Sequence, residues 1–434
     1  MRGLVRQRAL VQRVRILAER FPFITNVALL TSGTIVGQAI TVLVLPVLTR
    51  FYSPDAFGLL GIYMSVLMMI SPAACARFEL AIPLPQRDED AINLLALSII
   101  AATVVSAVLG IITVAGPSVV AAMLRQPRIE PYLWMIPLGI WFTALYSAIQ
   151  LWSIRKGRYR DVARTQLIRA IGGSGGQVGF GVAAWSPFGL LFGYLLYSGL
   201  GSFGLGRLLW LRERKLLHAI SWTALRRNLR EQRRFPLFSV PESLCDAAAN
   251  NLPLLLIASI GGAREAGFML LAQRITSIPV ALIGTNISRV YLAEGAGRHR
   301  RGELGAFTRK VMRHLLFVGA GPFLILAIVA PIAFAWVFGS EWDRAGVMVT
   351  WLVPSMMLQF LASPVSTIMA VTQKQHVSFL LQLYGLVTMI AAIGLAAAIA
   401  PDASFEFFAV ASASYYAAYV IVVLHRTWRC AAAE

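Results

Sequence analysis

Twelve long apolar runs dominate the sequence and limit the folds that it can adopt. A stretch such as AINLLALSIIAATVVSAVLGIITVAG, residues 91–116, exceeds the roughly 20 residues that an α-helix needs to cross a bilayer, and a buried helix of a soluble protein seldom needs so many. The runs lie at residues 23–49, 57–83, 91–115, 132–154, 165–186, 188–210, 237–260, 266–291, 311–338, 345–370, 376–400 and 404–424. We therefore expect an all-α, multi-pass (polytopic) membrane protein with about twelve transmembrane helices.

The composition agrees with this class. Of the 434 residues, 58% are hydrophobic and 14% are charged, whereas soluble domains are roughly half apolar and a quarter charged. The two runs around GGSGGQVGFGVAAWSPFGLL, residues 172–191, are the weakest, because glycine dilutes them and only Ser186 and Pro187 separate them. A count of ten helices is the alternative.

The basic residues alternate between the two sides of the expected bundle. If the amino terminus lies inside, 33 of the 39 Lys and Arg residues fall on the inner side. The remaining six are Arg50, Arg125, Arg128, Arg264, Arg274 and Arg344. An excess of Lys and Arg marks cytoplasmic loops. We therefore expect both termini in the cytoplasm.

The net charge of +19 thus indicates topology and not nucleic-acid binding, because the arginines lie beside spans and not in a folded polar domain. Residues 1–22 contain six arginines among Leu, Val and Ile, a pattern that predicts a helix on the cytoplasmic surface. Anionic lipids of the inner leaflet would attract such a helix. We expect no cleavable signal peptide.

Several landmarks occur twice in the chain. The stretch ERFPF, residues 19–23, has a near copy in RRFPL, residues 233–237, and each follows a basic segment and precedes an apolar run. Gly58 matches Gly267, and Pro137 matches Pro354 in the same way, with all the spacings between 209 and 217 residues. Landmarks in constant order at a nearly constant spacing indicate an internal repeat.

The repeat predicts two six-helix halves. Because six is even, both halves enter from the cytoplasm, and a pseudo-two-fold axis along the membrane normal would relate them. The expected divisions are a cytoplasmic basic segment at 1–22, an N-terminal half at 23–210, a basic linker at 211–236, a C-terminal half at 237–424 and a cytoplasmic tail at 425–434.

Three stretches resemble a known family: LPVLTRFYSPDAFGLLGIYMS, RFELAIPLP and the long segment from FPLFSVPESLCDAAANN to SRVYLAE. They are similar to polysaccharide biosynthesis proteins, the oligosaccharide flippases of the multidrug/oligosaccharidyl-lipid/polysaccharide (MOP) superfamily. The resemblance covers essentially the whole chain and implies a fold like that of the multidrug and toxin extrusion (MATE) transporters. It also implies transport of lipid-linked oligosaccharide, typically on undecaprenyl diphosphate, from the cytoplasmic to the periplasmic leaflet of a bacterial inner membrane.

That resemblance places the protein in the biosynthesis of a surface polysaccharide, such as a lipopolysaccharide O-antigen or an exopolysaccharide. Its partners would be the lipid-linked oligosaccharide, membrane lipids, a polysaccharide polymerase and glycosyltransferases. No nucleic acid is expected among them.

Ionisable residues inside spans are costly and often mark transport pathways. Asp246 and Arg274 both fall near the middle of consecutive spans, counted at about 1.5 Å per residue. Glu242, Asp246 and Asn250 are four residues apart and so form a polar stripe on one helix face. Two interpretations stay open: a structural Asp246–Arg274 ion pair, or side chains that line a cavity, with Arg274 on the diphosphate and the carboxylates coupling an ion.

Three further polar residues are candidates. Arg77 and Glu79 fall at the cytoplasmic end of the second predicted span, where Arg77 could either bind a diphosphate or extend to the lipid headgroups. Glu79 is a second candidate for ion coupling. Gln38, midway along the first span, either lines the cavity or bonds to a neighbouring helix.

Catalytic and metal-binding patterns are missing from the sequence. The five histidines show no paired spacing, and Cys75, Cys245 and Cys430 are isolated. We expect no catalytic residue, no metal and no cofactor, and the sequence contains no ATP-binding motif. The alternative functions are a drug or cation antiporter of the same superfamily and, with less support, a membrane-embedded polysaccharide polymerase or ligase.

Overall fold

The computed structural model describes residues 22–301, 303–365 and 375–432. All regular secondary structure in these residues is helical. The first helices are α2 (Pro22–Leu43), α3 (Leu45–Phe51), α4 (Pro54–Ala74), α5 (Asp88–Ala115), α6 (Pro117–Met123), α7 (Met135–Arg155), α8 (Tyr159–Val182) and α9 (Phe188–Leu217). They are followed by α10 (Trp222–Glu231), α11 (Val240–Arg300), α12 (Leu304–Phe338), α13 (Asp343–Val365), α15 (Gln375–Ile399) and α16 (Ser404–Ala432). The predicted surface segment 1–22 lies, apart from Pro22, outside the described residues.

Ten stretches of described helix are long and apolar enough to cross a membrane, which confirms the predicted class of protein. Several of them leave large apolar side chains uncovered. On α12, Phe317, Ile332 and Trp336 are 78%, 77% and 84% exposed. Soluble monomers rarely expose apolar faces of this kind, and the hydrocarbon core of a bilayer would cover them.

Helix α8 is not among those ten stretches, because glycine and arginine lower its hydropathy. It corresponds to the weakest predicted span. Its glycines instead allow close packing: a Cβ on Gly173 would lie 2.6 Å from the side chain of Tyr197 in α9. Small residues that let helices approach closely are typical of membrane interfaces.

Helix α11 contains two legs. Gly262 interrupts it with φ of 81° and ψ of −179°, a conformation that glycine adopts far more readily than other residues. Leu254, before the turn, and Leu270, after it, both lie within 3.5 Å of the point where a Cβ of Gly61 would stand. The legs therefore run side by side against α4. The first leg contains the predicted span 237–260 from Val240 onward, and the second contains the predicted span 266–291.

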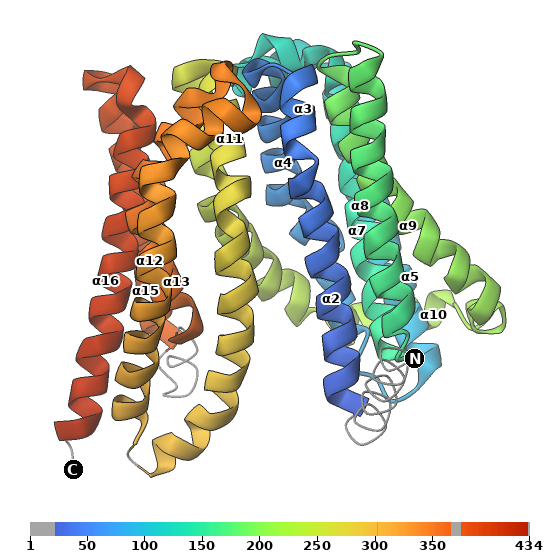
Figure 1. Ribbon diagram of the computed structural model, residues 1–434. Coiled ribbons are helices and arrows are strands. Elements are labelled where there is room, and N and C mark those ends of the chain that lie inside the picture. The colour runs from blue at the N-terminus through green and yellow to red at the C-terminus, as the bar shows by residue number, and fades with distance from the viewer. Residues whose placement is uncertain (1–21, 302, 366–374, 433–434) are drawn as a thin grey trace, which may run out of the picture.

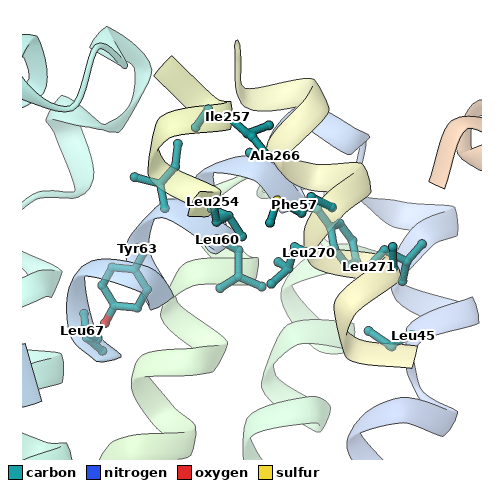
Figure 2. Close-up of a cluster of buried hydrophobic side chains, with 14 of the residues drawn as sticks. Leu45, Phe57, Leu60, Tyr63, Leu67, Leu254, Ile257, Ala266, Leu270 and Leu271 are labelled. Atoms are coloured by element: carbon teal, nitrogen blue, oxygen red, sulfur yellow. The ribbon is translucent and has the colours of Figure 1, made fainter. Parts of the chain in front are cut away.

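The packing of α4 on these legs forms a large buried apolar cluster. Figure 2 shows Leu60 of α4 between Leu254 of the first leg and Leu270 of the second. Two backbones touch directly beside this cluster. A Cβ on Gly58 would lie 1.7 Å from the carbonyl oxygen of Ala263, and one on Gly267 would lie 1.9 Å from that of Pro54.

The helices from α2 to α9 and from α11 to α16 pack into two groups (Figure 1). We call α2–α9 the first group, in which α8 packs on α2 and α9, and α7 packs on α5 and α9. We call α11–α16 the second group, in which α13 packs on α11, α12 and α16. Two features of the expected architecture stay predictions. One is the pseudo-two-fold axis between the halves, and the other is the set of boundaries at 23–210, 211–236, 237–424 and 425–434.

The direct backbone contacts between the two groups lie at one end of the molecule. The start of α2 and the end of α16 are at the other end (Figure 1). Besides the glycine contacts, the ring of Phe57 in α4 meets Trp342 edge-on at 4.9 Å between centroids. Arg50, in the last turn of α3, donates to the carbonyls of Trp336 and Val337 at 3.4 Å. We call this the closed end and the opposite one the terminal end.

Candidate functional site

A cavity of about 530 Å³ lies where α4 meets the second group of helices. Its wall combines Met64 and Met68 of α4 with residues of α11, α13, α15 and α16. The polar residues of this wall are Ser65, Asn250, Asn251, Gln273, Arg274, Thr276, Ser277, Ser355, Gln359, Ser412 and Tyr416. Arg274 is the one charged residue among the described residues that line it. The cavity therefore carries a positive charge and many neutral hydrogen-bonding groups.

Arg274 lies on the second leg of α11 and is half-buried. Its Nη2 is 2.8 Å from the Sδ atom of Met64, and a thioether is only a weak acceptor. The described ion pairs give it no carboxylate within 4 Å. An intramembrane cation without such a counter-ion can bind an anion.

A smaller cavity of about 200 Å³ adjoins the first one. Asp246 lines it, together with Tyr415 of α16 and Leu386 of α15. Asn250 and Tyr416 line both cavities and form part of the wall between them. The structure therefore places Asp246 and Arg274 in neighbouring compartments.

The predicted stripe on the first leg of α11 is present. Asn250 donates through Nδ2 to the main-chain oxygen of Asp246 at 2.8 Å, and its distance to Oδ1 of the same residue is 3.5 Å. Glu242 is exposed one turn earlier and lines neither cavity. Asp246 and Arg274 do not form an ion pair in this conformation of the described chain.

Arg77 and Glu79 follow the second span instead of belonging to it. Helix α4 ends at Ala74, and Arg77 takes up a left-handed backbone conformation with φ of 60° before the short 3₁₀-helix η1 (Phe78–Ala81). Nη1 of Arg77 is 3.6 Å from Oε1 of Glu79. The prediction extended this helix too far because residues 80–84 are apolar although they do not continue it.

Glu79 is 4% exposed, although η1 lies outside the candidate spans. Burial raises the pKa of the Glu79 carboxyl above its ordinary value, whereas its own backbone hydrogen bond and the charge of Arg77 lower it. Neither Arg77 nor Glu79 lines either of the two cavities described above. Gln38 is exposed on α2 and lines neither of them. The roles proposed for these residues stay predictions.

Arg169 is a buried cation inside the predicted span 165–186 that was not among the candidate site residues. It is 7% exposed in α8, and its guanidinium lies over the rings of Tyr146 and Tyr197, at 3.8 and 4.3 Å from their centroids. Its Nε donates to the carbonyl of Tyr197 at 3.1 Å. The apolar neighbours Leu167, Ile168 and Ala170 were a signal that this arginine belongs to a span.

A second charged cluster lies at the closed end. Nη1 of Arg344 is 2.7 Å from Oε1 of Glu406, and its Nε is 3.4 Å from Oε1 of Glu265. The cluster joins α11, α13 and α16 within the second group of helices, so we assign it a structural role. Among the described residues searched, no three His, Cys, Asp or Glu side chains come together to hold a metal ion.

Comparison with known proteins agrees with this architecture. A family model described as "Polysaccharide biosynthesis protein" matches residues 47–347. No individual protein of curated function matches the sequence. The fold is similar to that of the solved structure "Lipid II flippase MurJ, inward closed conformation", with a TM-score of 0.73 and 10% identity over 93% of this chain and 90% of that chain.

Two further solved structures are similar. One is a MATE family multidrug resistance transporter of the MOP superfamily in an inward-facing conformation, with a TM-score of 0.68 and 13% identity over 93% of this chain and 98% of that one. The other is a MOP superfamily transporter from Pyrococcus furiosus, described by a reversed polarity of its binding pocket that suggests a different function. Its TM-score is 0.56, with 14% identity over 93% of this chain and 96% of that one.

Proposed function

Because this chain belongs to the polysaccharide biosynthesis protein family and its fold is similar to that of a MOP superfamily transporter, we propose that it is a flippase for lipid-linked oligosaccharides. It would carry the unit, linked to undecaprenyl diphosphate, from the cytoplasmic to the periplasmic leaflet by alternating access. Glycosyltransferases would supply the unit, and a polymerase of surface polysaccharide would consume it.

The charge of the larger cavity is the observation that carries this proposal. A diphosphate is anionic and needs positive walls, whereas a cationic drug needs carboxylates. The cavity is lined by Arg274 and by no Asp or Glu among the described residues. A planar guanidinium donates two parallel hydrogen bonds to phosphate oxygens. The neutral amides and hydroxyls of the wall match the hydroxyl-rich surface of a sugar.

The direction of transport rests on the charge asymmetry of the loops. The excess of basic residues that the sequence assigns to the side of the termini supports a cytoplasmic location for the terminal end. The closed end would then face the periplasm. In this orientation, the protein would be in a conformation that closes the cavity toward the periplasm.

Asp246 supplies the proposed ion coupling. It lies in the smaller cavity beside Tyr415, and Asn250 separates it from the compartment of Arg274. A proton or cation on Asp246 would change the charge near the shared wall without touching the substrate. Glu242 and Glu79 line neither cavity, so Asp246 with Asn250 is the better supported pair.

The same carboxylate favours one alternative function, a MATE-like antiporter of drugs or cations. A cationic drug would bind in the smaller cavity at Asp246, and Arg274 would then be dispensable. The two functions therefore differ in which of these two side chains the substrate needs.

Replacement of Arg274 tests the proposal. In cells that lack the chromosomal gene, Arg274→Gln should reduce surface polysaccharide and cause lipid-linked precursor to accumulate. Loss of a charged hydrogen bond costs about 1.5–3 kcal/mol, or roughly 10- to 150-fold in affinity. The matched control is Arg264→Gln, because Arg264 is an exposed arginine of the same helix at the closed end. Normal polysaccharide with altered dye efflux would contradict the flippase and support the antiporter.

A further inference from the structure

The linker helix α10 is fixed to the first group of helices. Its attachment is centred on Asn93 of α5, which is 1% exposed. The amide of Asn93 donates to the carbonyl of Ala219 at 3.1 Å, and its Oδ1 accepts from the main-chain nitrogen of Ser221 at 3.1 Å. One buried side chain therefore bonds to both ends of the connection that leads into α10.

The inner face of α10 completes this contact. Leu225 and Asn228 are buried, and Nδ2 of Asn228 donates to the carbonyl of Asp90 at 3.4 Å. Arg227 forms an ion pair with the side chain of Asp90. Asp90 and Asn93 belong to the first two turns of α5, so α10 lies where that span enters the membrane.

The outer face of α10 has no partner among the described residues. Trp222 and Leu229 are 66% and 46% exposed, and they lie two turns apart on one side of the helix. The guanidinium of Arg226 lies 5.2 Å from the ring of Trp222, and Arg230 follows one turn later. The described ion pairs give neither arginine a carboxylate.

We propose that this outer face, formed by Trp222, Arg226, Leu229 and Arg230, binds the headgroups of anionic phospholipids. Tryptophan and arginine beside an apolar side chain are typical of helices that lie in the bilayer interface. The position of α10 at the entry of α5 brings these side chains to the depth of the headgroups. The charge of the two arginines selects anionic over zwitterionic lipids. This inference is independent of the transported substrate.

A lipid surface fits better than an acidic protein for two reasons. The indole ring of Trp222 and the side chain of Leu229 need an apolar phase beside the arginines, and the bilayer supplies it without a further component. The attachment to α5 also prevents α10 from moving away from the membrane to meet a cytoplasmic protein.

Photo-crosslinking of the full-length protein tests this inference. The protein is reconstituted in liposomes with diazirine-bearing phosphatidylglycerol or diazirine-bearing phosphatidylcholine, and labelled peptides from 218–234 are quantified. Each basic residue at an anionic surface contributes about 1 kcal/mol, or about fivefold in binding. The double variant Arg226→Gln/Arg230→Gln should lower the anionic-to-zwitterionic labelling ratio by about that factor for each arginine. Arg125→Gln/Arg128→Gln, at the closed end, should leave the ratio unchanged.

A second variant tests the apolar part of the surface. Trp222→Ala/Leu229→Ala should reduce labelling of 218–234 by both lipids. Because none of the four residues bonds to Asn93 or Asp90, all variants should unfold at the wild-type temperature. An unchanged ratio in the arginine variant, or unchanged labelling in the apolar variant, would overturn the proposal. Crosslinks from α10 to a cytoplasmic protein in cells, with no lipid preference in liposomes, would also overturn it.

Discussion

The side-chain amide of Gln126 donates a 2.6 Å hydrogen bond to the main-chain carbonyl of Ala258, and this bond joins the two groups of helices. Gln126 precedes the short helix η2 (Pro127–Tyr132), whereas Ala258 lies in the last turn before Gly262 ends the first leg of α11. The last carbonyls of a helix lack intrahelical partners. Gln126 is 8% exposed, so the bond supplies a partner where water has little access.

Replacement of Gln126 by leucine should weaken the closed end. A buried carbonyl without its partner costs about 1–3 kcal/mol, which would shift a two-state equilibrium about 5- to 150-fold toward a conformation in which the groups separate there. Spin labels on Ser118→Cys and Ser340→Cys, in a background without native cysteines, measure the separation. We expect a larger population at long distance.

Arg128→Gln is the control for this experiment. Arg128 lies two residues away but pairs with Asp55 of the same group, and 74% of its side chain is exposed. Exposed ion pairs contribute little, so the distance distribution should stay as in the wild type. Equal distributions in Gln126→Leu and Arg128→Gln would show that the Gln126 bond does not hold the end closed.

Gly58→Ala should prevent the close approach of α4 to α11. The new Cβ would overlap the carbonyl oxygen of Ala263, which is backbone and cannot rotate away. We expect a lower unfolding temperature and a shift of the same spin-label distance to larger values. Gly179→Ala in α8 is the matched control, because its Cβ would meet no atom within 4 Å. Wild-type distances in Gly58→Ala would mean that the contact is not required for closure.

The double variant Asp246→Asn/Arg274→Gln should not recover the function lost in Arg274→Gln. The two charges lie in neighbouring cavities and form no ion pair. Arg274→Gln therefore does not leave Asp246 without a counter-ion, and the added Asp246→Asn change has nothing to compensate. Polysaccharide output and protein level, measured together, decide the outcome. Recovery of both in the double variant would indicate an ion pair in another conformation of the protein.

Arg169→Lys should destabilise the first group of helices. Lysine cannot reproduce the contact of a flat guanidinium with two rings together with the Nε bond to Tyr197. A desolvated cation–π contact is worth about 2 kcal/mol, so thermal unfolding in detergent should begin at a lower temperature. Arg164→Lys, an exposed position of the same helix, should unfold as the wild type does. The same unfolding temperature in both variants would contradict this assignment.

Glu79 should make stability depend on pH. Its pKa is raised in the folded protein by burial, so the folded state holds the proton over a pH range in which the unfolded state has lost it. Stability is therefore greatest below the unfolded pKa and falls as pH rises through the folded value. From acidic to neutral pH, the unfolding temperature of the wild type should therefore fall relative to that of Glu79→Gln. Parallel curves would exclude a contribution from Glu79.

Hydropathy predicted the class of protein and the position of most spans, because lipid requires long apolar helices whatever their neighbours. It also separated the two legs of α11, whose turn at Gly262 follows a nearly uncharged stretch. It did not predict the interior of α8, where Arg169 is stabilised by tyrosine rings that come from α7 and α9. These tyrosines are brought to Arg169 by tertiary packing, which a hydropathy pattern does not record.

The candidate site was predictable only in part. Asp246 and Arg274 were found because charges within apolar runs are rare. Their separation into two cavities depends on which faces of α11 meet α4 and α16, and the sequence of α11 alone does not specify its neighbours. Arg77 and Glu79 were assigned to the end of the second span because the residues of η1 are mostly apolar, as the continuation of a transmembrane helix would be.

The attachment of α10 determines which part of the chain can bend when the two groups of helices move against each other. Asn93 and Asp90 bind α10 to α5, so the linker must travel with the first group of helices. The second group begins at Val240, and only Gln232 to Ser239 lie between. Those residues include the π-helical turn η3 (Phe235–Ser239), a form that often marks functional sites within helices. Any movement of one group against the other must therefore change the course of the chain within these eight residues.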